Sequence, residues 1–195
     1  MRPAAPGPSR SAPARSAPTL LLLNGAPGSG KSTLAALLAA ERSGALSLDI
    51  DGIKHSLGGW EEDLTASGRQ SRRLALAMAG RQLADGFDVV IGQYLARTEF
   101  LEELEQLAAE HGARFVDAVL VLDERTLRTR LAGRRERPDR PEQVADDRHV
   151  RPEDAPALIR AIEGMFAQRP HARRIAADGA VPEVLEALRG VLPDP

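Results

Sequence analysis

An apolar run, a glycine-rich stretch and a helical run follow one another near the start of the chain, and this order strongly constrains the fold. Residues 19–23 read Thr-Leu-Leu-Leu-Leu, residues 25–32 read Gly-Ala-Pro-Gly-Ser-Gly-Lys-Ser, and a helical pattern covers 31–43. The middle stretch satisfies the pattern GxxxxGK[ST], in which backbone amides converge on phosphate oxygens at the start of a helix. A glycine-rich turn is the alternative, but the flanking elements are those that a phosphate loop (P-loop) requires. The sequence therefore predicts a nucleoside triphosphate site.

The residues of this loop have separate expected roles. We expect the backbone amides of the loop to hold phosphate, Lys31 to place its ammonium on the β- and γ-phosphates, and the Ser32 hydroxyl to bind Mg²⁺. The predicted nucleotide-binding residues are Gly25, Ala26, Pro27, Gly28, Ser29, Gly30, Lys31, Ser32 and Thr33. The pattern leaves open whether the nucleotide is ATP or GTP.

Short apolar runs alternate with longer amphipathic segments along the remainder of the chain. This alternation predicts an α/β fold, with a parallel sheet covered by helices on both faces. The expected strands are 19–24, 45–49, 88–93, 114–122 and 174–176, and the expected helices are 31–43, 51–57, 66–85, 98–111, 124–136, 153–167 and 181–191.

Length and composition indicate one domain. The 195 residues, 43% of them hydrophobic, suffice for one substantial core. Residues 2–18 are all Ala, Pro, Ser, Gly or Arg, with no acidic residue and no large aliphatic side chain. We therefore expect a disordered tail at 1–18, the alternative being a basic arm, and one folded domain containing the phosphate loop at 19–195. The net charge of −2 and the short apolar runs favour a cytoplasmic protein that binds neither nucleic acid nor membrane, and the absence of cysteine excludes a thiolate metal site.

Two carboxylates follow the second expected strand. Asp49 and Asp51 are spaced i, i+2, and Lys54 follows three positions later. Because ligands bind beyond the carboxyl ends of parallel strands, these side chains are expected in the crevice of the phosphate loop. We interpret Asp51 as the general base for an acceptor hydroxyl and Asp49 as an acid that holds metal-bound water. The alternative is that Asp51 only caps a helix and Asp49 only makes a turn.

Arginines gather after the fourth expected strand. They are Arg125, Arg128, Arg130, Arg134, Arg135 and Arg137, followed by Pro138-Asp139-Arg140-Pro141. Such a segment is typical of a lid, here about 134–150, whose arginines neutralise the charge of a transferring phosphoryl group. We assign this catalytic role to Arg130 and Arg134, one turn apart, and interpret the others as surface residues.

With these motifs the chain resembles the small P-loop kinases of the nucleotide/shikimate kinase-like superfamily, most of all the chloramphenicol phosphotransferase-like and AAA_33-type kinases. The resemblance spans about residues 19–191 and rests on the loop, the Asp49-Ile50-Asp51 segment with Lys54, Tyr94-Leu95-Ala96-Arg97 and the arginine-rich segment. It implies a three-layer P-loop NTPase fold with five parallel strands in the order 2-3-1-4-5. It also implies a base at Asp51, a lid arginine at Arg134 and a base-contacting loop containing Asp178.

The acceptor side carries fewer signals. Relatives often have an acid at the end of the third strand, where this chain has Ile91-Gly92-Gln93-Tyr94, so Mg²⁺ is expected to rely on Ser32, phosphates, water and Asp49. Gln93 and Tyr94 are predicted to bond the acceptor, although Tyr94 equally suits the core. Trp60, the one tryptophan, is predicted to contact substrate together with Lys54; the alternative is that Trp60 closes its loop onto the core.

These residues together predict an enzyme that transfers the γ-phosphoryl group of ATP to a hydroxyl of a small molecule, such as an antibiotic or a hydroxylated metabolite. Two alternatives share the nucleotide site: a 5′-hydroxyl polynucleotide kinase, and a nonenzymatic nucleotide-dependent switch. Glu61-Glu62-Asp63 at the rim argues against the first, because carboxylates repel polynucleotide phosphates. The sequence leaves open whether the chain is a monomer or a homodimer.

Overall fold

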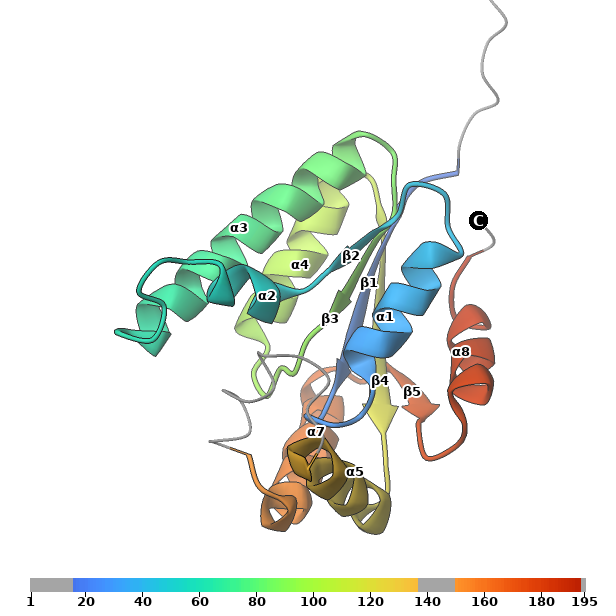
Figure 1. The fold of residues 1–195 in the computed structure, drawn as a ribbon. Helices are drawn as coiled ribbons and strands as arrows, with labels where there is room; N and C mark the ends of the chain where they lie inside the picture. The colour runs from blue at the N-terminus through green and yellow to red at the C-terminus, as the bar shows by residue number, and fades with distance from the viewer. Residues whose placement is uncertain (1–15, 137–149, 194–195) are drawn as a thin grey trace, which may run out of the picture.

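The computed structural model describes residues 16–136 and 150–193, which form strands and helices in alternation (Figure 1). The strands are β1 (Thr19–Gly25), β2 (Leu46–Leu48), β3 (Val89–Gly92), β4 (Arg114–Val121) and β5 (Arg173–Ala176). The helices are α1 (Lys31–Ala40), α2 (Ile50–His55), α3 (Leu64–Ala84), α4 (Glu99–Glu110), α5 (Glu124–Glu136), the 3₁₀ turn η1 (Pro152–Asp154), α7 (Ala155–Gln168) and α8 (Val181–Arg189).

The five strands make one parallel sheet in the order β2-β3-β1-β4-β5, which confirms the predicted order. β1 lies at the centre, between β3 and β4, and its register places Leu22 beside Ile91 on one side and Asp117 on the other. The order of strands reverses at β1, and in parallel sheets the crevice at such a point is the usual ligand site. The loop that leaves β1 therefore occupies the position that a ligand-binding loop requires.

Helices cover both faces of the sheet, as predicted. Side chains alternate between faces along β1: Leu20 and Leu22 pack in a core cluster with α3 and α4, whereas Leu21 and Leu23 pack in a second cluster with α1 and α8. All seven residues of β1 are buried. Two buried faces explain why this strand reads as an unbroken run of leucines rather than an alternating pattern.

The second strand was predicted over 45–49 and covers Leu46–Leu48 in the structure, so Asp49 lies outside it. The Asp49 backbone is extended, and its carboxylate accepts hydrogen bonds from the amides of Asp51 and Gly52, so Asp49 is the N-cap of α2. The expectation that Asp49 ends the strand and Asp51 opens the helix was wrong by one residue: β2 ends at Leu48, and α2 begins at Ile50. Asp63 caps α3 in the same way, through the amides of Thr65 and Ala66, so α3 begins two residues before its predicted start.

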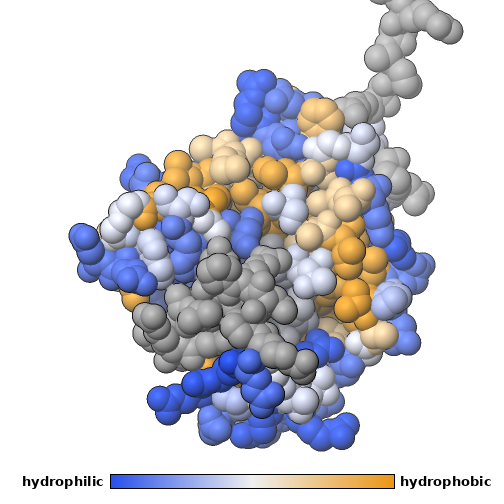
Figure 2. Space-filling model, viewed as in Figure 1, coloured by the Kyte–Doolittle hydropathy of each residue, from blue (hydrophilic) through white to orange (hydrophobic). Residues whose placement is uncertain are grey.

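Large apolar side chains remain exposed on some helices. Leu37 on α1 is 39% exposed, Leu74 and Met78 on α3 are 37% and 45% exposed, and Figure 2 shows apolar surface over these helices. None of the helices in the described ranges has both the length and the apolar content to cross a membrane. Residues 1–15 of the predicted tail and 137–149 of the predicted lid, with Arg137 and Arg140, lie outside the described residues.

Candidate active site

The phosphate loop joins the centre of the sheet to the start of α1. Gly25 is the last residue of β1, Ala26, Pro27, Gly28 and Ser29 follow, Gly30 is the N-cap of α1, and Lys31, Ser32 and Thr33 form its first turn. The Ser29 amide donates to the Ala26 carbonyl (3.1 Å), which closes the loop into a turn. The predicted nucleotide-binding residues are thus contiguous in space as well as in sequence.

The first turn of α1 is suited to an anion. Gly30 caps the helix with φ 95°, a conformation that side chains disfavour, and glycine offers no side-chain acceptor to the first amides of the helix. No acidic residue stands in the first turn. The amide groups and the positive end of the helix dipole therefore favour an external anion such as phosphate. The exposed Ser32 hydroxyl lies in the same turn, where it can bind a cation beside that phosphate.

The Lys31 side chain folds back over the loop. Its ammonium donates to the Ala26 carbonyl (2.9 Å), and Lys31 is only 9% exposed. Gly92, at the end of β3, lies against the backbone of Lys31: a Cβ atom at Gly92 would stand 3.2 Å from the Lys31 carbonyl group. A side chain at the end of β3 would therefore press on the start of α1. This close approach gives a physical reason for a glycine at the end of β3.

Arg130 on α5 joins the phosphate loop to the loop after β5. Its guanidinium donates to the carbonyl of Ala177 (2.8 Å) and, more weakly, to that of Ser29 (3.4 Å). Leu127 and Leu131 on the same helix lie beneath Gly28. Arg130 is therefore in contact with the backbone of both loops, and its catalytic role stays a prediction. Arg134 is half-buried one turn further along α5.

The loop after β5 is connected to the loop after β4 through Asp178. The Asp178 carboxylate accepts a hydrogen bond from the Asp123 amide (2.9 Å), and the Asp123 carboxylate in turn caps α5 through the amide and hydroxyl of Thr126. These bonds with Thr126 hold the pKa of Asp123 below its usual value. Asp178, predicted to bind nucleotide, is thus an exposed residue whose carboxylate fixes the position of its own loop.

The two carboxylates after β2 differ in their surroundings. One oxygen of Asp49 is engaged in capping α2, whereas Asp51 stands in the first turn of that helix and is partly exposed. Within residues 16–136 and 150–193, no group of three or more His, Asp or Glu side chains gathers to hold a metal ion. A cation at this site would therefore need ligands from phosphate and water besides Ser32 and Asp49, an arrangement that Mg²⁺ tolerates well.

A single substitution separates the two roles of Asp49. Asparagine caps helices as well as aspartate, so Asp49→Asn is expected to leave the melting temperature unchanged, whereas Asp49→Ala should cost about 1 kcal/mol of stability. If the Asp49 charge supports Mg²⁺, Asp49→Asn will raise the Mg²⁺ concentration needed for half-maximal turnover. A Mg²⁺ titration of nucleotide turnover checks this expectation. An unchanged requirement would mean that Asp49 serves only as a cap.

Trp60 packs against the end of α2. The His55 ring meets the Trp60 ring edge-on with the ring centroids 4.2 Å apart, and the Lys54 ammonium lies 5.4 Å from the Trp60 ring centroid. His55 Nδ1 donates to the Asp51 carbonyl (2.7 Å), and the Ser67 hydroxyl donates to the Trp60 carbonyl (3.0 Å). The packing onto α2 agrees with Trp60 closing its loop, and it also brings Lys54 and Trp60 together on the helix that carries Asp51.

The exit of β3 lies beside the phosphate loop. The backbone amide of Gln93 donates to the Leu23 carbonyl (3.1 Å). The side-chain oxygen of Gln93 is buried without a hydrogen-bond partner among the described residues. Tyr94 is half-buried against the core cluster of α1 and α8, and this burial raises the pKa of its phenol. Its hydroxyl therefore stays protonated at neutral pH and can act as a hydrogen-bond donor.

The sequence interpretation missed Asn24, which bonds the exit of β3 to the end of β1. It is fully buried, and its side chain makes hydrogen bonds with the backbone of both Gly25 and Leu95. One signal could have found it: Asn24 is the single amide at the end of a run of four leucines, and a buried polar side chain requires partners.

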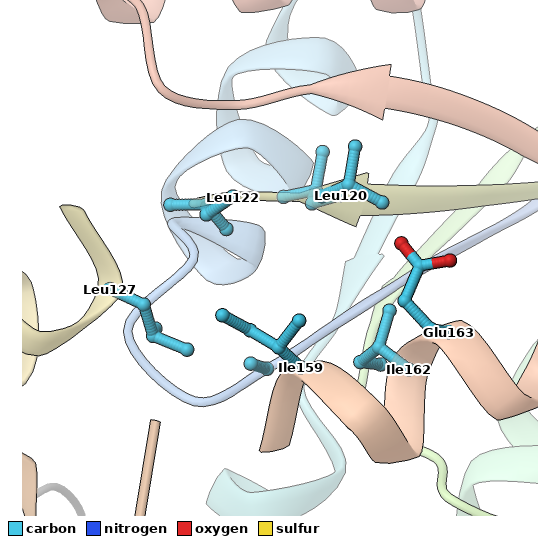
Figure 3. A pocket seen from close by; sticks show the side chains of 8 residues that line it. Leu120, Leu122, Leu127, Ile159, Ile162 and Glu163 are labelled. Atoms are coloured by element: carbon cyan, nitrogen blue, oxygen red, sulfur yellow. The ribbon is translucent and has the colours of Figure 1, made fainter. Parts of the chain in front are cut away.

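A small apolar pocket lies behind the phosphate loop (Figure 3). Its lining residues are Ala26, Leu120, Val121, Leu122, Leu127, Ile159, Ile162 and Glu163. The one charged side chain, Glu163, is paired with Arg174 through both carboxylate oxygens. Phosphate would find no cation or amide donor in this lining, so we interpret the pocket as loose packing among β4, α5 and α7 that supports the loop.

A glycine-rich loop between the central strand and α1, in a five-stranded parallel sheet of this order, defines the P-loop NTPase fold. Within that class the chain belongs to the AAA_33 family, because the model of this family, described as an AAA domain, matches residues 20–152. No curated protein matches the chain by sequence.

Several solved structures share the fold. A gluconokinase from Sinorhizobium meliloti 1021 is 19% identical over 91% of this chain and 93% of that chain, with a TM-score of 0.59. The tunicamycin resistance protein of Deinococcus radiodurans is 15% identical over 91% and 99% of the two chains, with a TM-score of 0.56. The Pnkp1/Rnl/Hen1 RNA repair complex contains a chain with 21% identity, covering 80% of this chain and 49% of that chain, with a TM-score of 0.58. At these identities the likeness establishes a kinase-like P-loop fold.

Proposed function

We propose that this protein is a small-molecule kinase that transfers the γ-phosphoryl group of ATP, with Mg²⁺, to a hydroxyl group of its acceptor. The observation that supports this proposal most directly is the start of α1, where a glycine cap, a first turn without acids and the Lys31 ammonium come together. Structural similarity to a gluconokinase and to a tunicamycin resistance protein agrees with a small acceptor, such as a hydroxylated metabolite or an antibiotic.

Each part of the site has a role in this proposal. MgATP supplies the phosphoryl group and part of the charge that neutralises it. The loop amides and Lys31 hold the phosphates, and Ser32 and Asp49 serve the metal ion and its water. Arg130 braces the phosphate loop against the loop of Asp178, and the nucleotide base contacts the loop of Asp178.

On the acceptor side, Asp51 accepts the hydroxyl proton. A partly exposed carboxylate in the first turn of α2 can reach an acceptor that lies against that helix, and general-base catalysis requires such direct access. Lys54 and Trp60 offer a cation and an aromatic face to the acceptor, and Gln93 and Tyr94 offer hydrogen bonds from the exit of β3.

Arg134 acts in this proposal on the phosphoryl group during transfer. Arg134→Ala is therefore expected to lower the maximal rate more than it weakens nucleotide binding, because charge moves to the bridging and leaving oxygens only as the bond breaks. The measurement compares turnover with calorimetric affinity for a nonhydrolysable analogue. Arg135→Ala, an exposed neighbour on the same helix, is the matched control and should remain near wild type. Greater damage in the Arg135 variant would show that the register of the arginines is wrong.

The proposal can be tested with a panel of hydroxylated compounds, among them sugar acids, nucleosides and antibiotics, by measuring acceptor-stimulated ADP release. A short oligonucleotide with a 5′-hydroxyl belongs in the same panel, and its phosphorylation in preference to small molecules would favour a polynucleotide kinase. The exposed carboxylates of Glu61, Glu62 and Asp63 beside α2 argue against that result, because they repel a phosphate backbone.

If no compound stimulates turnover and nucleotide instead changes partner binding, the protein is a switch. Light scattering of the same sample distinguishes a monomer from a homodimer.

A further inference from the structure

Asn24 has a side chain in which both polar atoms are engaged. It is the last residue but one of β1 and is 0% exposed. Its Oδ1 accepts hydrogen bonds from the Gly25 amide (2.8 Å) and the Leu95 amide (2.9 Å), and its Nδ2 donates to the Leu95 carbonyl (3.0 Å). Three bonds in a buried environment hold a side chain rigidly, and loss of the amide would leave backbone groups of Leu95 unpaired.

These bonds begin where the sheet stops. The register of β1 and β3 ends at the pair Leu23 and Gly92, and the Gln93 amide makes a last bond to the Leu23 carbonyl. Beyond this point the Asn24 side chain takes the place of a further ladder bond and pairs with both backbone groups of Leu95. The strand connection thus extends past the end of β3, as far as the segment 93–95.

The two segments that Asn24 joins serve the two sides of the proposed site. Gly25 opens the phosphate loop, and residues 93–95 include Gln93 and Tyr94, which the proposed function assigns to the acceptor. A phosphoryl transfer requires the acceptor oxygen in line with the γ-phosphate, and a misplacement of about 1 Å can reduce the rate about 10²-fold. A rigid connection between the two segments therefore sets a distance on which transfer depends.

We propose that Asn24 is a positioning residue that fixes the acceptor-side segment 93–95 relative to the phosphate loop. The kinetic part of this proposal rests on the proposed kinase function, whereas the structural part does not. Asn24 itself is buried away from solvent, so its effect passes through Gly25 and Leu95 rather than through contact with substrate.

Tyr94 provides a measurement of the structural part. It is the chain's single tyrosine, and burial raises its pKa, so a titration followed by tyrosinate absorbance reports on the segment 93–95 alone. In Asn24→Ala we expect the segment to loosen and the Tyr94 pKa to fall toward the ordinary value of about 10. Leu22→Val, a buried change on the same strand, is the control for lost stability and should leave the titration unchanged. An unchanged Tyr94 titration in folded Asn24→Ala would overturn the proposal.

A second variant covers the case in which Asn24→Ala does not fold. Asn24→Asp keeps an oxygen for both amide donors and replaces the Nδ2 donor to the Leu95 carbonyl with a second oxygen, which repels that carbonyl unless the carboxyl is protonated. We expect a shift of the Tyr94 titration in the same direction. Amide exchange in the wild-type protein adds a test that needs no variant: the Leu95 amide should exchange slowly, and exchange as fast as that of exposed Ala96 would contradict the connection.

Kinetics test the catalytic part. In Asn24→Ala we expect transfer to the acceptor found in the panel to slow about 10²-fold, with unchanged affinity for a nonhydrolysable MgATP analogue. Equal losses of rate and affinity, or the same rate loss in Leu22→Val, would mean that Asn24 supports stability only. If the wild-type protein transfers phosphate to no acceptor, the proposed function fails, while the Tyr94 titration still decides whether Asn24 fixes the segment.

Discussion

Lys31→Ala is expected to abolish nucleotide turnover in a protein that remains folded. A cation that meets the transferring phosphoryl group contributes about 10³-fold or more to the rate of such reactions. The structural cost should be small, because alanine favours helix and a hydrogen bond such as the one from the Lys31 ammonium to the Ala26 carbonyl is worth about 1 kcal/mol. Turnover of MgATP with the acceptor panel and thermal melting by circular dichroism measure the two effects.

The chain provides its own control for this change. Lysine occurs at positions 31 and 54 alone, and Lys54 belongs to the proposed acceptor side. Lys54→Ala should raise the KM for the acceptor and leave nucleotide affinity unchanged. Lys31→Arg keeps the charge but places a planar guanidinium group where a compact ammonium is needed, so this variant should remain strongly impaired. Turnover near the wild-type rate in Lys31→Ala would remove the phosphate-loop assignment.

Asp51→Asn is expected to reduce transfer by about 10²-fold or more and to leave ATP binding intact, since positioned proton transfer contributes on that scale. The change retains the size of the side chain and its place in the first turn of α2, whose cap is Asp49. Single-turnover rates, measured with calorimetric affinities for a nonhydrolysable analogue, separate chemistry from binding. Equal losses of affinity and rate would assign Asp51 a structural or metal role, and full activity would favour the nonenzymatic switch.

The fold was predictable from the sequence because its signals are local. Leucine runs without alternation indicate strands buried on both faces, and the pattern GxxxxGK[ST] requires a strand before it and a helix after it. The strand order came from resemblance to a family, since periodicity alone does not order strands. The structure confirms that order.

The site was harder to predict because its contacts join distant residues. Arg130 donates to the carbonyls of Ser29 and Ala177, and Asn24 donates to the carbonyl of Leu95. Every residue has a backbone carbonyl, so the sequence does not show which of these groups a distant side chain contacts. Asp49 shows a different difficulty. A carboxylate after a strand suits both a metal ion and a helix cap, and only the backbone geometry shows that one of its oxygens caps α2.

The glycine cap of α1 links the thermal stability of this protein to its ligand. Gly30 offers the first amides of the helix no capping side chain, and a nucleotide phosphate bound there as proposed would complete the helix as a capping side chain does. A ligand that binds only the folded state adds about 2.7 kcal/mol of stability at a concentration of 100 times its Kd. If nucleotide is that ligand, as proposed, its concentration will help to determine how much of the protein stays folded and how long it survives proteolysis.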